Sequence, residues 1–166
     1  RPQLHRLQRL RQYRELYPPM KKGFTLVELL VSITIIGILA NIGLATFTSA
    51  QQKSRDAKRK AHLKQLADAF EAYYNDYGQY PDDADIAFDQ VFTDGKTIYM
   101  VKLPKDPTQG LTYEYLPAAD NKSFQLYARL ENSNDPAVLT FTSPPNCGTV
   151  ETLECNFGVS RGNTTP

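Results

Sequence analysis

The sequence predicts an α+β protein, in which a long N-terminal helix packs against a small antiparallel sheet of three or four strands. Three observations predict this fold. A run of 22 residues, 29–50, contains no charged side chain. An apolar stripe with helical spacing follows this run and ends near Tyr77. Beyond Pro81, apolar and polar residues alternate with the period of two that is typical of strands.

The uncharged run is long enough to cross a membrane, because a spanning helix needs about 20 apolar residues. The alternative is a signal peptide that is cleaved after Ala50, where "TSA" resembles a small-residue cleavage site. Such cleavage would release a soluble, secreted binding domain that begins at Gln51. The run is longer than the apolar core of an ordinary signal peptide, which has about 7–15 residues. A membrane helix is therefore favoured.

Glu28 lies at the start of the apolar run, where a charge is costly. A carboxylate in the middle of a membrane costs about 2.5–3.5 kcal/mol to insert, and less near the headgroups. One interpretation is an interfacial glutamate whose side chain reaches the headgroups. The other is a functional carboxylate that has a charged partner. The residues alone leave both interpretations open.

The stretch "KKGFTLVELL", residues 21–30, resembles the class III signal of type IV pilins and of the pseudopilins of type II secretion systems. The resemblance implies a pilin-like fold and cleavage by a prepilin peptidase between Gly23 and Phe24, with N-methylation of Phe24. It also implies that Glu28 attracts the terminal amine of a neighbouring subunit during filament assembly. The new amine would lie one helical turn from Glu28, near the positive end of the helix dipole. The resemblance therefore favours a functional carboxylate.

These observations also predict the domain organisation. Residues 1–19 are either non-native upstream sequence before a true start at Met20 or a basic surface helix, and the first interpretation is favoured. The expected parts are a leader over 1–23, a transmembrane and assembly helix over 24–50, an amphipathic helix over 51–80, and a globular β head with a disulfide loop and a disordered tail over 81–166.

The amphipathic helix carries a basic cluster close to the apolar run, formed by Lys53, Arg55, Lys58, Arg59, Lys60 and Lys64. We interpret the cluster as a solvated helix face or as a charge-pairing surface between subunits. The positive-inside rule by itself would keep it in the cytoplasm, whereas the resemblance places it outside. The whole chain has 19 Lys and Arg against 18 Asp and Glu, so we expect no nucleic-acid partner.

Four segments of the head have strand character. The alternation is clearest in "SFQLYARL", where Phe124, Leu126 and Ala128 share one face. The segments "LTYEYLP", "AVLTFT" and "TIYMVKL" are predicted as further strands, separated by turn-forming sequences such as "ENSNDP". The tail "SRGNTTP" is predicted to be disordered.

The loops contain oxygen-bearing residues that some related pseudopilins use to bind calcium, and the candidates are Asp120, Glu131 and Asp135. No EF-hand spacing is present, and Asx residues form turns without a metal. We therefore expect no cofactor, with calcium as the alternative. Cys147 and Cys155 are expected to form a disulfide outside the cytoplasm, and two free buried thiols are the alternative.

No catalytic constellation is present in the sequence, so we expect a structural protein and not an enzyme. The resemblance implies a subunit of a type II secretion pseudopilus or, as the close alternative, of a type IV pilus. The implied partners are other pilins or pseudopilins, the prepilin peptidase, an inner-membrane assembly platform and membrane lipid. The implied location is the inner membrane, with the N-terminus in the cytoplasm and the head outside, followed by an extracytoplasmic filament.

Overall fold

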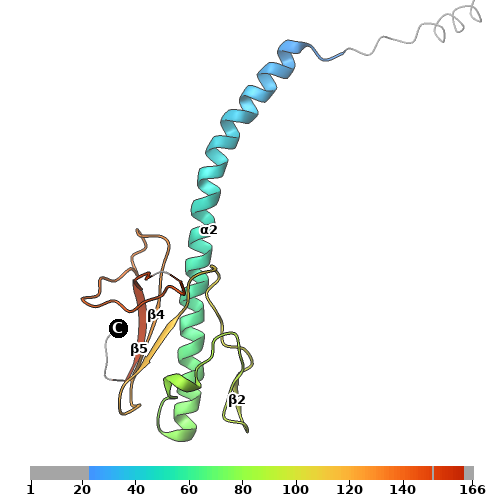
Figure 1. The fold of residues 1–166 in the computed structure, drawn as a ribbon. Coiled ribbons are helices and arrows are strands. Elements are labelled where there is room, and N and C mark those ends of the chain that lie inside the picture. The colour runs from blue at the N-terminus through green and yellow to red at the C-terminus, as the bar shows by residue number, and fades with distance from the viewer. Residues whose placement is uncertain (1–22, 151, 163–166) are drawn as a thin grey trace, which may run out of the picture. The chain divides into compact units, whose positions relative to one another are not determined.

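The computed structural model describes residues 23–150 and 152–162, and Figure 1 shows how the chain is arranged. Within these residues there is a long helix, a short 3-10 helix and five strands. The α+β fold class predicted from the sequence is thus confirmed. The elements are α2 (Leu26–Tyr77), η1 (Asp83–Asp85), β1 (Phe92–Thr93), β2 (Ile98–Met100), β3 (Glu114–Pro117), β4 (Phe124–Ala128) and β5 (Phe157–Arg161).

The chain divides into two compact units after Leu44. The described part of the first unit is residues 23–44, and its side chains are exposed throughout. The second unit begins at Ala45 and contains the remainder of α2 together with the head. The hydrophobic core lies entirely in this second unit.

The C-terminal half of α2 buries the apolar stripe that the sequence predicted. Leu63, Leu66 and Phe70 are completely buried. The ring of Phe70 lies 4.9 Å from the ring of Tyr115 and 5.6 Å from that of Phe124, measured between centroids. These aromatic contacts join the helix to β3 and β4, which stabilises both elements beyond the burial of area alone.

The main sheet has the order β3-β4-β5, and both pairs are antiparallel. Figure 1 shows the β4 and β5 arrows side by side along the lower half of the helix. Leu126 is paired with Tyr115 on one side and Val159 on the other. Phe124, Leu126 and Ala128 are buried, as the alternation predicted. Strands β1 and β2 form a separate two-stranded hairpin.

Two predictions about the head were wrong. The segment "AVLTFT", residues 137–142, forms no strand, and the free edge of β4 is occupied by β5 instead. Pro136 and Pro144 bracket the segment, and proline lacks the N–H that a ladder needs. The predicted disordered tail begins inside β5, because Ser160 and Arg161 pair with β4. Residues 163–166 lie outside the described part of the chain.

Candidate assembly segment and buried ion network

The predicted cleavage site lies immediately before α2. Gly23 and Phe24 have no regular secondary structure and are exposed, and the helix begins at Leu26. No other part of the described chain comes within 4 Å of a side chain built at Gly23. The bond between Gly23 and Phe24 is therefore accessible to a protease. The predicted leader before it, and the possible basic helix over 1–19, lie outside the described residues.

Glu28 and Thr25 form a reciprocal cap on the first turn of α2. The backbone N–H and the hydroxyl of Thr25 each donate to Glu28 Oε2 at 2.8 Å. The N–H of Glu28 donates in return to Thr25 Oγ1 at 3.2 Å. This is the capping-box arrangement, in which a threonine and a glutamate three residues later satisfy each other's backbone donors. In this structure Glu28 is thus held by its own helix.

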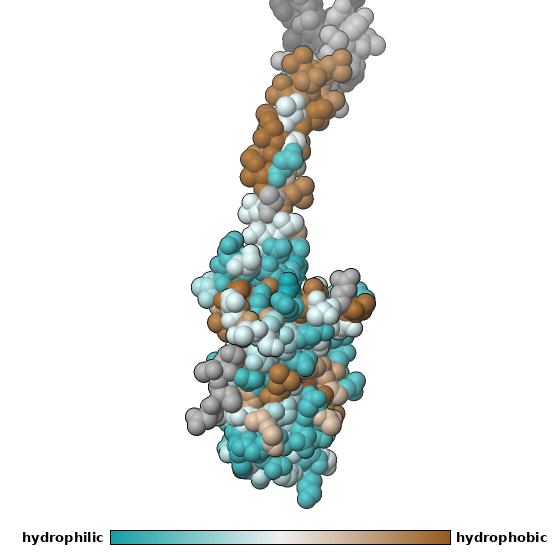
Figure 2. All heavy atoms as spheres, turned by 60° about the vertical axis from the view of Figure 1, so that its left-hand side comes forward, coloured by the Kyte–Doolittle hydropathy of each residue, from teal (hydrophilic) through white to brown (hydrophobic). Residues whose placement is uncertain are grey.

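Beyond Glu28 the first unit carries no charged side chain, and its polar residues are Ser32, Thr34 and Asn41. Its large residues are exposed to solvent in the isolated chain, including Leu26, Val27, Leu30, Ile33, Ile36 and Leu39. Among the described residues α2 is the one helix long and apolar enough to cross a membrane. Figure 2 shows the hydrophobic colour concentrated on this part of the helix, whereas the visible face of the head is mostly hydrophilic. Such a surface requires a lipid or protein environment.

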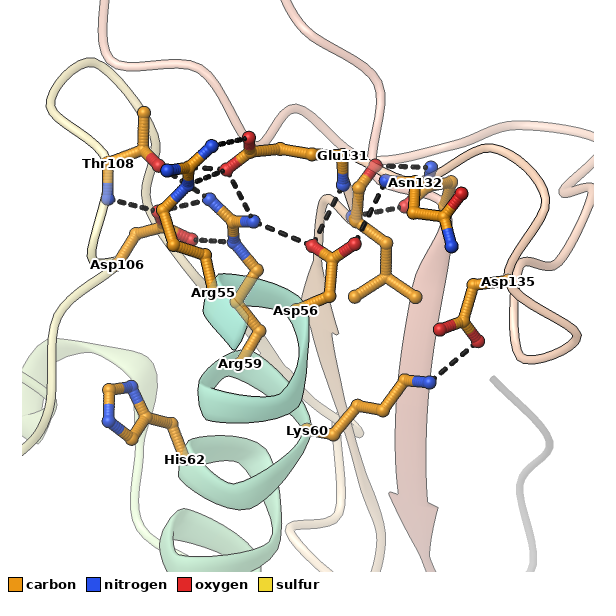
Figure 3. A network of polar contacts seen from close by, with 12 residues as sticks. Arg55, Asp56, Arg59, Lys60, His62, Asp106, Thr108, Glu131, Asn132 and Asp135 are labelled. Carbon is orange, nitrogen blue, oxygen red and sulfur yellow. Dashed lines mark hydrogen bonds and ion pairs between the residues drawn. The ribbon is translucent and has the colours of Figure 1, made fainter. Parts of the chain in front are cut away.

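A buried ion network lies where α2 enters the head (Figure 3). The side chain of Arg59 is completely inaccessible. Its Nε and Nη2 donate to the two carboxylate oxygens of Asp106, at 2.7 Å and 2.8 Å. Its Nη1 donates to Asp56 Oδ1 at 2.8 Å, and the same nitrogen lies 2.8 Å from Glu131 Oε1. Burial disfavours the guanidinium, but the hydrogen bonds to Asp106 and Glu131 outweigh it, so the pKa of Arg59 is raised.

Asp56 connects the helix to the loop after β4. Its Oδ1 accepts from the N–H of Glu131 and its Oδ2 from the N–H of Asn132, both at 2.9 Å. Thr108 adds a hydroxyl that donates to Glu131 Oε1 at 3.0 Å. No buried side-chain nitrogen or oxygen in the described residues lacks a hydrogen-bond partner. A buried charge network that is fully satisfied in this way fixes one arrangement of helix and loops.

Two more cations of the helix pair with the same loop. Arg55 Nε donates to Glu131 Oε1 at 2.7 Å, and Lys60 Nζ lies 2.6 Å from Asp135 Oδ1. The hydrogen bond from Arg55, aided by Arg59 and Thr108, lowers the pKa of Glu131 to about 2 against the effect of burial. The interpretation of the whole basic cluster as a solvated or intersubunit surface is therefore wrong for Arg55, Arg59 and Lys60. It remains open for the exposed Lys53, Lys58 and Lys64.

The calcium candidates are not brought together. Glu131 is engaged by Arg55 and Arg59, and Asp135 by Lys60. Asp120 accepts from the backbone N–H of Lys122 at 3.0 Å, as a turn residue does. No group of three or more His, Cys, Asp or Glu side chains within the described ranges could hold a metal ion. These three carboxylates thus form turns and ion pairs, and the structure gives no calcium site built from them.

Cys147 and Cys155 are joined by a disulfide, with their Cα atoms 5.2 Å apart. Both cysteines are buried against Tyr127 of β4. The bridge holds the loop directly before β5 against the sheet, and the N–H of Cys147 donates to Leu153 O at 2.7 Å inside it. The disulfide therefore supports the strand that the sequence did not predict.

Sequence reasoning missed Thr25 and Asp56. The signal for Thr25 is the pattern Thr-x-x-Glu directly before an apolar run, which is the sequence form of a capping box. The signal for Asp56 is its place three residues before Arg59, on the same helix face. Nothing local identifies Asp106, which lies 47 residues from Arg59 and reaches it only in the fold.

Comparisons with known proteins agree with this geometry. The sequence model described as "Prokaryotic N-terminal methylation motif" matches residues 19–40, which include Gly23, Phe24 and Glu28. No solved structure matches the chain.

Three curated relatives show how far the similarity extends. The type IV major pilin protein PilA of Myxococcus xanthus is 36% identical over 66 residues, which cover 40% of this chain but only 30% of that relative. The type II secretion system core protein G of Pseudomonas aeruginosa is 30% identical over 65% of this chain and 82% of its own length. The chain belongs to the type IV pilin and type II secretion pseudopilin family. The core protein G of Vibrio cholerae is 28% identical over 63% of this chain and 77% of that relative. It is thus a second core protein G to which the chain is similar over most of both lengths.

Family membership explains the exposed apolar helix. A pilin or pseudopilin is a structural subunit, and its isolated chain leaves the assembly surface uncovered. The methylation motif includes the exposed residues directly before α2, and the capped Glu28 lies at the beginning of the same surface. The alternative of a secreted domain released after Ala50 is disfavoured, and Ala50 itself lies within the uninterrupted helix α2.

Proposed function

We propose that this chain is a subunit of a type II secretion pseudopilus that is cleaved between Gly23 and Phe24 and assembles through the N-terminal half of α2. The observation that carries the proposal is the exposed apolar segment with its single carboxylate, Glu28, one turn from the new N-terminus. The secretion branch is favoured over a type IV pilus because the match covers 82% of a core protein G and only 30% of PilA.

The proposed partners follow from this surface. A prepilin peptidase cuts and methylates the chain while the helix is in the inner membrane, with the N-terminus in the cytoplasm and the head outside. A membrane assembly platform then moves the subunit from lipid into a filament of this and other pseudopilins. The role is mechanical and not enzymatic: lipid contacts of the apolar helix are exchanged for contacts with other helices.

The proposal predicts the mature terminus and the phenotype of Glu28→Ala. Mass spectrometry of the membrane-extracted chain should find N-methylated Phe24 as the first residue. Glu28→Ala should still be cleaved and inserted but should yield at least about tenfold fewer filaments, because a desolvated amine without its carboxylate is strongly disfavoured. Sheared filaments are quantified by immunoblot against the total chain.

Thr25→Ala is the matched control, because Glu28 also caps its own helix. This variant removes two of the three hydrogen bonds in the cap and keeps the carboxylate. It should assemble within about twofold of the unaltered chain, since losing a cap costs only about 0.5–2 kcal/mol. A mature chain that begins at Gln51, or a normal filament yield from Glu28→Ala, would contradict the proposal.

A further inference from the structure

The head has a pocket on its side. It lies between the end of α2 and the β1–β2 hairpin, has a volume of about 430 Å³, and is lined by Tyr73, Tyr77, Asp85, Phe92, Thr93 and Asp94. Its walls are therefore aromatic rings and its charges are two carboxylates.

The aromatic walls are firmly packed. The rings of Tyr73 and Tyr77 are stacked with centroids 4.6 Å apart, and Tyr73 also contacts Phe92 at 5.5 Å and Tyr99 at 5.3 Å. An aromatic face attracts an ammonium or guanidinium group through its quadrupole. Tyr77 is about half exposed. The ring face of this wall is thus available at the surface.

The two carboxylates differ in how they are held. Asp94 accepts from the hydroxyl of Tyr77 and from the backbone N–H groups of Lys96 and Thr97, so its orientation is fixed. Asp85 is exposed, and its carboxylate has no hydrogen-bond or ion-pair partner within the described ranges. No cation of the described chain forms an ion pair with either carboxylate. The fixed carboxylate of Asp94, the unpaired carboxylate of Asp85 and the stacked tyrosine rings together suit a cationic side chain.

Lys58 is an exposed cation of α2 whose charge suits such a pocket. It is exposed on α2, and it forms no ion pair in the part of the chain that the structure describes. The residues one helical turn away from it are Ser54, Arg55, Ala61 and His62, so the helix offers it no carboxylate. Lys64 is also exposed, but it has Asp68 one turn on. Lys53 is exposed as well, and the aspartate one turn from it is the buried Asp56, whose oxygens already accept from Arg59 and from two backbone N–H groups.

We propose that Lys58 of one copy inserts into the pocket formed by Tyr73, Tyr77, Asp85 and Asp94 of a neighbouring copy. The inference rests on the proposed function, because only parallel copies in one filament bring different heights of the helix into contact. Lys58 precedes the pocket tyrosines by 15–19 residues on the same helix. At 1.5 Å per residue, the contact staggers neighbouring copies by roughly 22–29 Å along the helix axis.

The contact is heterologous, since the pocket and the lysine are different surfaces of one chain. Such contacts repeat from copy to copy, and they build an open filament where the rotation between copies does not close a ring. The pairing of a lysine with two carboxylates also favours this stagger over others. A different stagger would leave these charges unpaired or place like charges together, which is costly.

Charge reversal tests the contact in full-length filaments. Lys58→Glu and Asp85→Lys should each lower the filament yield at least about fivefold, because each places like charges together. The double variant should return the yield to within about twofold of the unaltered chain. Lys64→Glu is the matched control, with the same charge change on the same helix, and should leave the yield unchanged. Circular dichroism of each variant in detergent confirms that the head is folded.

Cross-linking supplies a second measurement. Cysteines introduced by Lys58→Cys and Asp85→Cys should form a disulfide between copies in filaments, whereas Lys53→Cys with Asp85→Cys should not. The native cysteines are already bonded to each other. If the unaltered chain forms no filaments, the proposed function fails and this contact fails with it. If filaments form but the reversals have no effect, the double variant is not rescued, or Lys53 cross-links instead, the contact alone is wrong.

Discussion

Arg59 is the residue on which the junction of helix and head depends. Its guanidinium is completely buried and makes ion pairs with three carboxylates, those of Asp56, Asp106 and Glu131. Taking these charges out of water is expensive, and the pairing repays the cost only while every member is present. The network therefore contributes more to a unique arrangement than to net stability.

Arg59→Met should destabilise the head by about 3–5 kcal/mol, because it leaves Asp56 and Asp106 buried without their cation. Unfolding by urea in detergent, followed by the fluorescence of the 10 tyrosines in a chain without tryptophan, measures the change. Lys64→Met, at an exposed position of the same helix, should change stability by less than about 0.5 kcal/mol. A loss below about 1 kcal/mol for Arg59→Met would show that the network is dispensable.

At the scale of the elements, Gly78 ends α2. Its φ of +66° is in the left-handed region, and its N–H donates to Tyr74 O at 2.7 Å. No other part of the described chain lies within 4 Å of a Cβ built there, so a substitution meets only the backbone cost. A residue with a Cβ resists this conformation, and glycine and asparagine tolerate it best.

Gly78→Ala should accordingly lower the stability of the head by about 1 kcal/mol, and Gly78→Asn by less. Urea unfolding measures both changes, because a shift of the midpoint with an unchanged m value reports a change in the free energy of unfolding. Equal midpoints for the alanine and glycine chains would mean that the helix end shifts without cost and that the positive φ is not required.

The elements also show how far the sequence determines the fold. The stripe of Leu63, Leu66 and Phe70 and the apolar face of β4 are local patterns, and both were predicted correctly. Tyr127, on the other face of β4, is also buried, which the alternation did not predict. Strand β5 has only Phe157 and Val159 as apolar residues between small and charged ones, and its pairing with β4 depends on the loop closed by the disulfide. A pairing made over such a distance leaves little trace in the local sequence.

The candidate sites divide in the same way. Gly23, Phe24 and Glu28 stand in one short motif, so they could be assigned from the sequence. The partners of Arg55 and Arg59 could not, because Asp106 and Glu131 lie in loops of the head and approach the helix only after folding. A run of lysines and arginines on a helix resembles a solvated face until the loops that cover it are known.

At the scale of the whole molecule, the loop after β4 is attached to the helix through acids that must stay ionised, in addition to the apolar core. Glu131 connects Arg55 and Arg59 to the loop after β4, and its pKa is about 2 in the fold against an ordinary value of 4.5. The partly buried pair of Asp135 with Lys60 also lowers the pKa of the Asp135 carboxyl, mainly through the hydrogen bond from Lys60. Both acids belong to the segment that follows β4 and both pair with α2.

The acid stability of the whole chain should therefore depend on Glu131. Its folded pKa lies below the unfolded one, so the unfolded chain binds more protons between pH 4.5 and pH 2. The stabilisation is complete above pH 4.5 and is lost as the pH falls towards 2. Because 20% of the side chain is exposed, we expect a loss on the order of 2–3 kcal/mol, somewhat below the full value of the shift.

Urea unfolding of the full chain in detergent, repeated at pH 7, 4.5, 3.5 and 2.5, measures this dependence. Glu131→Gln should be less stable at pH 7 and should lose less stability between pH 4.5 and 2.5 than the unaltered chain, because its side chain does not titrate. Glu154→Gln, which removes an exposed acid outside the network, should retain the slope of the unaltered chain. Parallel curves for the unaltered chain and Glu131→Gln would place the acid sensitivity elsewhere and would show that the helix–head junction does not depend on an ionised Glu131.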